Sequence, residues 1–164
     1  MARRDKFYQI VCDRLEADGW TITHEEYIFD ADPQLSTDLG AERLITEERQ
    51  LEKIAVEIRS FLLDSQVADR EKAVGQYGRY RKLLELQDPA RTLYLAVPLH
   101  AYEDIFARQV GKLAIEVFEL QLIVYDIVQA EMGISRQQIC INFLPPEVRV
   151  LTDHQERQPD LELA

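Results

Sequence analysis

A short apolar run, Thr92 to Val97, carries no charged residue on either of the two faces that a strand would present. Such a run is typical of a central strand that is covered on both sides by other parts of the protein. A second uncharged run, Leu120 to Tyr125, follows a segment of helical character, Tyr102 to Glu119. The order strand, helix, strand predicts an α/β fold in which both runs are buried strands.

The rest of the chain contributes a helix, a strand, a hairpin and a long helix. Hydrophobic periodicity predicts a helix over 5–18, a strand over 20–29, a loop over 30–36, a hairpin of strands over 38–45 and 53–61, and a helix over 65–86. Gly19 follows the first helix, where a residue that tolerates positive φ is favoured. The full order predicts a mixed sheet flanked by helices.

Size and charge narrow the class of protein. A chain of 164 residues is long enough for one domain with a core and too short for two full ones. Its net charge is −11, whereas a domain that coats nucleic-acid phosphates is usually basic, so any DNA contact must come from a local patch or through a partner.

Cys12 and Cys140 are too few for a disulfide framework or a four-thiolate zinc site. The most apolar stretch, 120–128, is too short to span a membrane, so we expect a cytoplasmic protein without membrane contact.

The hairpin contains the one arrangement that could carry chemistry. Segment 53–61 alternates between an apolar face and a face that carries Glu57 and Arg59, and Asp38 begins the other strand. Two carboxylates that converge at a sheet edge can hold a hard cation such as Mg²⁺, which polarises a phosphodiester and activates water. A cation two residues past the second acid can orient that water or stabilise developing charge. The alternative on spacing alone is a cross-strand ladder of ion pairs.

A second candidate is a basic and aromatic patch on the helix predicted over 65–86. Arg79, Arg81 and Lys82, together with Tyr77 and Tyr80, could contact a phosphate backbone. The alternative is a solvated helix face whose tyrosines pack inward.

Five segments, in chain order, resemble the XisH family, the cyanobacterial controlling factor for excision of the fdxN element. They are Asp18-Gly19-Trp20-Thr21-Ile22-Thr23-His24, Asp38-Leu39-Gly40-Ala41-Glu42, Lys53-Ile54-Ala55-Val56-Glu57-Ile58-Arg59-Ser60-Phe61, Gly75-Gln76-Tyr77 with Tyr80, and Leu93-Tyr94-Leu95-Ala96-Val97-Pro98. The resemblance extends over residues 1–127. XisH is in turn similar to the PD-(D/E)XK superfamily, which implies a restriction-endonuclease-like mixed sheet flanked by helices.

That resemblance assigns roles to residues of the candidate site. It makes Asp38 the first metal-binding acid and Glu57 the second, with Mg²⁺ or Mn²⁺ as the cofactor. It puts Arg59 at the position of the motif lysine and Gln76 on the helix that follows, which completes the implied catalytic set. Arginine keeps a charge at the site but does not deprotonate, so Arg59 cannot act as a base. Tyr8 stands where the family has a histidine in the first helix.

The end of the chain carries a different resemblance. Gly133-Ile134-Ser135, Gln138-Ile139-Cys140-Ile141 and Phe143-Leu144-Pro145-Pro146-Glu147-Val148-Arg149 resemble the C-terminal end of XisI, the partner protein of XisH. The chain is therefore interpreted as a XisH-like domain over 1–127 joined to a XisI-like tail over 128–164, partly disordered. We expect residues 138–143 to add a strand to an edge of the sheet or to pair with another chain, with little regular structure beyond Pro146.

Two functions from different classes follow. In the first, the protein is an accessory controlling factor for site-specific excision of a DNA element, with a XisI-like protein and a site-specific recombinase as partners. In the second, it is a metal-dependent DNA endonuclease of the PD-(D/E)XK type. The net charge and Arg59 favour the first, and the presence of Asp38 and Glu57 keeps the second open. A homo-oligomer is also left open.

Overall fold

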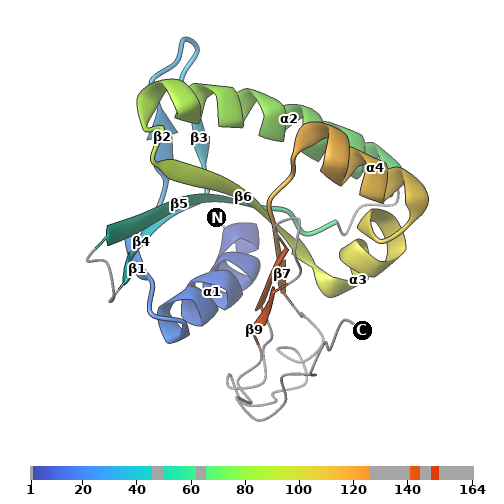
Figure 1. Ribbon diagram of the computed structural model, residues 1–164, viewed down its shortest axis with the longest axis horizontal. Helices are drawn as coiled ribbons and strands as arrows, with labels where there is room; N and C mark the ends of the chain where they lie inside the picture. Colours follow the sequence, from blue (N-terminus) through green and yellow to red (C-terminus); the bar gives the residue numbers. More distant parts are fainter. Residues whose placement is uncertain (1, 46–49, 62–65, 126–140, 145–148, 152–164) are drawn as a thin grey trace, which may run out of the picture.

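A mixed sheet of seven strands runs through the molecule in the order β1-β4-β5-β6-β7-β8-β9 (Figure 1). The computed structural model describes residues 2–45, 50–61, 66–125, 141–144 and 149–151. The strands are β1 (Thr21–His24), β4 (Leu39–Ile45), β5 (Gln50–Ile58), β6 (Arg91–Pro98), β7 (Leu122–Tyr125), β8 (Ile141–Leu144) and β9 (Arg149–Leu151). The pairs β5–β6 and β6–β7 are parallel and the others are antiparallel. The predicted mixed α/β architecture is confirmed.

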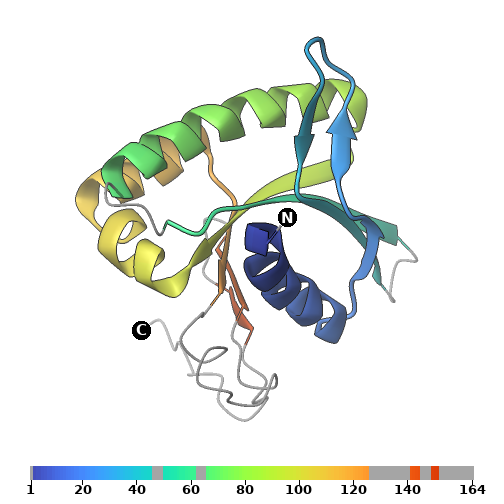
Figure 2. The same cartoon turned by 180° about the vertical axis from the view of Figure 1, so that it is seen from behind.

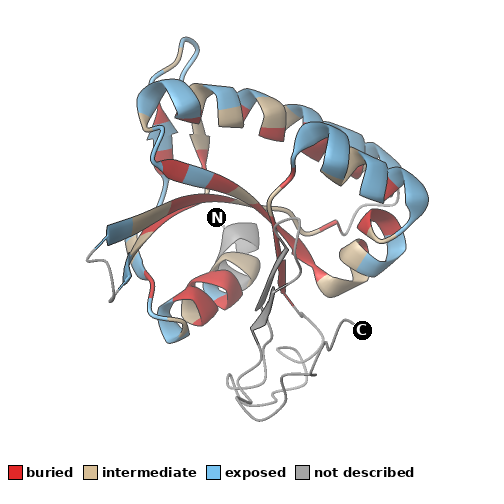
Figure 3. Cartoon of the chain, in the orientation of Figure 1, coloured by how far each residue is buried: buried red, intermediate tan, exposed pale blue. Residues whose placement is uncertain are grey.

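Helices cover both faces of this sheet, as Figures 1 and 2 show. Helix α1 (Ala2–Ala17) lies on one face, and α2 (Gln66–Gln87), α3 (Leu99–Ala101) and α4 (Gln109–Phe118) lie on the other. The alternation in β5 follows these layers, because Ile54 and Val56 belong to the core cluster under α1 while Ala55 belongs to the cluster under α2. Figure 3 shows buried residues along the central strands. The uncharged run in β6 is therefore the central strand that the sequence predicted.

The end of α1 follows the sequence prediction closely. Gly19 has a φ of +90°, the left-handed conformation that glycine adopts without steric cost. Trp20 then turns into the core under α1, where it is 3% exposed. Cys12 is a buried free thiol in the same helix, and burial raises its pKa to about 11. Cys140 lies outside the described residues.

The strand predicted over 20–29 is wrong in one respect, since it is two strands in two sheets. β1 ends at His24, and β2 (Tyr27–Phe29) pairs instead with β3 (Leu35–Thr37), which lies at the end of the predicted loop. The break falls at the exposed pair Glu25 and Glu26. The β2–β3 ribbon rises from the sheet beside α2 (Figure 2), and this places Tyr27 and Phe29 in the core cluster under α2.

The helix predicted over 102–119 is also interrupted. The structure has α3, then a π-helical turn (Tyr102–Phe106), and then α4 after a break at Ala107 and Arg108. The reason is a close approach of two backbones: a Cβ on Gly111 would lie 2.5 Å from Cα of Phe106. A continuous helix would not fold back on itself in this way.

Helix α2 confirms the predicted helix almost to the residue, with one exception on its buried face. Val74, Tyr77 and Leu84 are buried as expected, but Val67 is 59% exposed. Val67 borders an open hollow that it shares with Arg70 and Val110, so the first turn of α2 does not pack on the sheet.

The tail adds a strand to the edge of the sheet, which is one of the two outcomes that the sequence predicted, the other being pairing with another chain. β8 pairs antiparallel with β7, with Leu122 opposite Leu144 and Val124 opposite Asn142. The expectation of little regular structure beyond Pro146 is corrected by β9, which pairs with β8. Residues 126–140, which include the expected domain boundary and the first part of the expected strand over 138–143, lie outside the described residues. No helix in the described part of the chain is long and apolar enough to cross a membrane.

Candidate functional site

A polar cleft with a volume of about 420 Å³ opens where the end of β5, the base of the β2–β3 ribbon and one side of α2 meet. All four residues that the resemblance assigned to a site line it, namely Asp38, Glu57, Arg59 and Gln76. It is also lined by residues that the sequence did not single out for this site: Glu26, Ser36, Thr37, Lys72 and Tyr80. The predicted grouping of the four side chains is therefore present.

The hairpin register brings the two carboxylates to the same place. Leu39 pairs with Val56, so Asp38, the residue just before β4, lies beside the end of β5. The Asp38 carboxylate accepts a hydrogen bond of 2.6 Å from the backbone N–H of Ile58. Because this bond ties the side chain to the partner strand, Asp38 is held at the cleft by the hairpin itself.

Glu57 is held by a buried hydroxyl from the ribbon. Thr37 is 2% exposed, and its Oγ1 lies 2.7 Å from the Glu57 carboxylate and 3.0 Å from the carbonyl oxygen of Val56. Its single proton can be donated to either acceptor. Thr37 carries no motif of its own in the sequence, and its position next to Asp38 is the one signal that could have pointed to it.

Arg59 continues the line of β5 and is fixed through its backbone. Its N–H donates to the carbonyl of Ala96 at 2.9 Å, and its carbonyl accepts from the hydroxyl of Tyr125 at 3.0 Å. Its side chain lies beside Glu57, with Nε 3.6 Å from Oε1, and Nε is buried without a hydrogen bond. The guanidinium therefore balances the charge of Glu57 through a loose contact.

Gln76 reaches the cleft from α2, one helical turn before Tyr80. Its amide Nε2 donates to the Tyr80 hydroxyl, while its Oε1 is buried with no hydrogen-bond partner. Burial raises the pKa of Tyr80, and the nearby Glu57 carboxylate adds to the rise. Tyr80 thus stays a neutral hydroxyl, and the amide oxygen of Gln76 is a buried acceptor without a hydrogen-bond partner in the described structure.

A cross-strand ion pair, as the alternative on spacing alone predicts, is present in another part of the hairpin. Arg43 and Glu52 are opposite each other in the register and form an ion pair of 2.8 Å between Nη2 and Oε2. At the cleft, by contrast, Asp38 is bonded to a backbone amide and Glu57 to a hydroxyl. The cleft end of the hairpin is therefore built differently from a simple ladder.

The donor set at this cleft suits a hard cation. Magnesium in proteins is bound by one or two carboxylates and keeps several waters, and the cleft offers Asp38, Glu57 and the unpartnered oxygen of Gln76. Among the residues that the structure describes, no three or more histidine, cysteine, aspartate and glutamate side chains are placed so that together they could hold a metal ion. The site fits a cation that needs few protein ligands and not one that needs an all-protein cage.

The basic and aromatic patch is not one surface. Tyr77 and Tyr80 are 2% and 4% exposed, so the tyrosines pack inward as the alternative predicted. Arg81 turns away from the cleft and donates 2.6 Å to the carbonyl of Phe118 at the end of α4.

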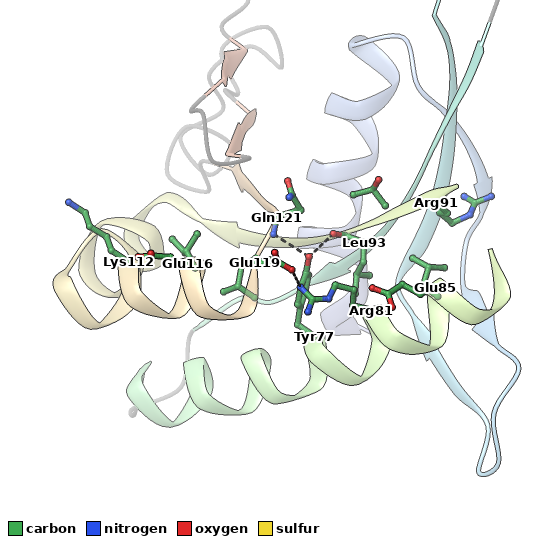
Figure 4. Close-up of a pocket in the computed structure, with 13 residues that line it drawn as sticks. Tyr77, Arg81, Glu85, Arg91, Leu93, Lys112, Glu116, Glu119 and Gln121 are labelled. Atoms are coloured by element: carbon green, nitrogen blue, oxygen red, sulfur yellow. Dashed lines mark hydrogen bonds and ion pairs between the residues drawn. The ribbon is translucent and has the colours of Figure 1, made fainter. Parts of the chain in front are cut away.

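Arg81 instead borders a second hollow of about 690 Å³ between α2 and α4 (Figure 4). Its floor holds Tyr77, whose hydroxyl donates to the carbonyl of Leu93 at 2.9 Å and accepts from the N–H of Gln121 at 3.2 Å. Burial raises the pKa of Tyr77 to about 12. None of the four predicted site residues lines this hollow.

Comparisons of the sequence and of the structure with known proteins point to the same family. The family model described as XisH protein matches residues 1–133. No curated protein matches the chain. A crystal structure of a XisH family protein from Nostoc punctiforme is 37% identical, with a TM-score of 0.67 over 76% of this chain and 94% of that one. A crystal structure of a fdxN element excision controlling factor protein from Anabaena variabilis is 36% identical, with a TM-score of 0.66 over 77% and 94% of the two chains. On the family match and these two likenesses, the chain belongs to the XisH family.

Proposed function

We propose that this protein is an accessory controlling factor for site-specific excision of a DNA element, and that it acts in the cytoplasm through protein partners. The observation that carries the proposal is the match to the Anabaena variabilis protein, which is described as a fdxN element excision controlling factor and of which 94% is covered. A site-specific recombinase performs the strand exchange, and a XisI-like protein is the second partner. The net charge of −11 supports an action through partners rather than through a broad basic surface.

An excision assay tests this proposal. A reporter element is placed in cells that express the recombinase and a XisI-like protein, with or without this protein, and excision is measured by amplification across the rejoined junction. We expect excision to depend on the protein and to persist in the double variant Asp38→Asn, Glu57→Gln. Equal excision with and without the protein would contradict the accessory role.

A metal-dependent nuclease is the second candidate, because the cleft groups Asp38, Glu57, Arg59 and Gln76. Asp38 and Glu57 would hold Mg²⁺ or Mn²⁺, with the Gln76 amide oxygen as a further donor. When bound, the ion would polarise a phosphodiester and lower the pKa of a bound water. Arg59 then balances negative charge at the phosphate but takes no proton from water, because a guanidinium does not deprotonate in proteins.

This alternative predicts two separable results. Binding of Mn²⁺, measured by calorimetry or by the paramagnetic resonance of free Mn²⁺, should be lost in Asp38→Ala and kept in Asp69→Ala, which changes an acid outside the cleft. Cleavage of plasmid DNA by the unchanged protein should be negligible, and Arg59→Lys should raise it if the missing base is the limit. Robust cutting by the unchanged protein that is lost in Glu57→Ala would show that Arg59 does not prevent catalysis.

A further inference from the structure

One side of α2 carries a stripe of residues, some of which line the cleft while others are exposed to solvent. Gly75 and Gln76 are neighbours, and each lies three or four residues from Lys72 and from Arg79, which puts all four on the same side of a helix. Lys72 and Gln76 line the cleft, and Lys72, Gly75 and Arg79 are exposed. Figure 3 shows the outer side of α2 as largely exposed. The cleft therefore continues onto a basic helix surface.

The two cations of this stripe are unused within the part of the chain that the structure describes. Neither Lys72 nor Arg79 forms a hydrogen bond or an ion pair there, whereas Arg70 and Arg81 on the same helix pair with Glu71 and Glu119. The stripe thus presents its positive charge outward.

Gly75 lies between these cations and has no packing reason to be glycine. A Cβ at this position would meet no atom within 4 Å, and glycine is less stable than alanine in the middle of a helix. Its effect is to leave the helix backbone bare, so that a ligand can approach it closely. This observation is independent of the two charges.

We infer that the side of α2 formed by Lys72, Gly75 and Arg79 binds the phosphate backbone of DNA along the edge of the cleft. Seven residues of helix separate the cations by about 10 Å, which equals roughly three base-pair steps of rise along the axis of a DNA duplex. The inference rests on the proposed function only in naming DNA as the ligand.

The acids of the cleft set the conditions for this binding. Glu26, Asp38 and Glu57 line the same cleft as Lys72 and repel a phosphate there. A divalent cation lowers this repulsion, so we expect DNA to bind more tightly with Ca²⁺ than with a chelator at equal ionic strength. Arg79 lies outside the group of residues that line the cleft, so its contribution should depend less on the cation.

The test is fluorescence anisotropy of the intact protein with a labelled 20-base-pair duplex in Ca²⁺, across a series of salt concentrations. Removing one phosphate contact in Lys72→Ala or Arg79→Ala should weaken binding about 8-fold at 0.1 M salt and reduce the slope of log K against log salt by about 0.9. Lys112→Ala is the matched control, because Lys112 is an exposed cation on α4 that lines the second hollow. It should leave both quantities unchanged.

Gly75→Leu separates close approach from charge. It should weaken DNA binding while the far-ultraviolet circular dichroism and the melting temperature show an intact fold. Inorganic phosphate at matched ionic strength should compete poorly, since one phosphate cannot contact both cations. Equal losses in Lys72→Ala and Lys112→Ala, or no duplex binding by the unchanged protein, would overturn the inference. If excision still depended on the protein, the proposed function would stand although the DNA-binding inference had failed. If the protein bound DNA but excision did not depend on it, the DNA-binding inference would stand and the proposed function would fail.

Discussion

Alanine substitutions of Gly78 and Gly111 remove the same conformational freedom from two helices, yet the structure predicts opposite effects on stability. Gly78 lies in the middle of α2, and a Cβ there meets no atom within 4 Å. Gly111 lies in the first turn of α4, and a Cβ there falls well inside van der Waals contact with the carbonyl oxygen of Ile105 and 2.5 Å from Cα of Phe106. The chemistry of the change is identical, so only the surroundings differ.

The magnitudes follow from these surroundings. Gly78→Ala should raise the free energy of unfolding by about 1 kcal/mol, the difference in helix propensity, and raise the melting temperature by about 2–4 °C for a chain of this size. In Gly111→Ala the obstructing atoms are backbone and cannot swing aside, so α4 or the π-helical turn must move. Overpacking of this kind costs about 1–3 kcal/mol, which should exceed or cancel the gain in propensity.

The assay is urea unfolding followed by circular dichroism, with thermal melting as a second reading. We expect Gly78→Ala to unfold at higher urea than the unchanged protein and Gly111→Ala at lower urea, with the same slope for both. If Gly111→Ala stabilised the protein as much as Gly78→Ala does, the result would contradict the close approach of α4 to the π-helical turn. If Gly78→Ala were destabilised, the surface of α2 would not be bare there.

Three further predictions concern the second hollow, the cleft and the tail. The pKa of Tyr77 is about 12 against an ordinary value of 10.0. The neutral hydroxyl therefore stabilises the fold fully below pH 10, and this stabilisation is lost as the pH rises through 12. The free energy of unfolding in urea should fall by about 3 kcal/mol over this range, and Tyr77→Phe should not show this fall. Thr37→Val keeps the shape but removes the hydroxyl beside Glu57, and should lower the free energy of unfolding by about 1–3 kcal/mol in the same assay, whereas the exposed control Thr92→Val should change it little. In the tail, hydrogen exchange should protect amides in 141–144, and a chain cut after Asp126 should melt at a lower temperature; unprotected amides with an unchanged melting temperature would mean that β8 contributes nothing.

Much of the fold could be predicted because its signals are local. The uncharged run in β6 and the alternation in segment 53–61 each identify a strand and its buried faces without knowledge of the partner. The periodicity of α2 likewise places Val74 and Leu84 in the core, as observed. These elements were predicted because each carries its own pattern over at least one full strand or several helical turns.

The elements that were not predicted depend on distant partners. Thr21 to Phe29 is rich in strand-forming residues on both sides of Glu25 and Glu26, and nothing local shows that Tyr27 leaves the first sheet to pair with Thr37. The break before α4 depends on the contact between Gly111 and Ile105, and Arg81 turns toward the carbonyl of Phe118, which is remote in sequence. Such choices are made by tertiary packing, so periodicity does not reveal them.

The candidate site shows the same division. Strand alternation alone places Glu57 and Arg59 on one face, but it does not distinguish a cleft from an ion-pair ladder, and the resemblance to the family was needed for that step. Lys72 was missed because a single lysine on an exposed helix face resembles any solvated lysine. A usable signal was its position one helical turn before Gln76, which the resemblance had already assigned to the site.

Arg59 shows how the fold separates the position of a residue from its chemistry. Its backbone is held on both sides, by Ala96 in β6 and by the hydroxyl of Tyr125 in β7, and neither bond involves the guanidinium. The only ion pair that holds its side chain in the described structure is the 3.6 Å contact with Glu57, which a lysine at the same position could also make. Exchange of the side chain should therefore change the proton chemistry of the cleft without moving the strand end that carries it. A difference in activity between arginine and lysine at this position can be attributed to the side chain itself, because a guanidinium stays charged while an amine can lose its proton.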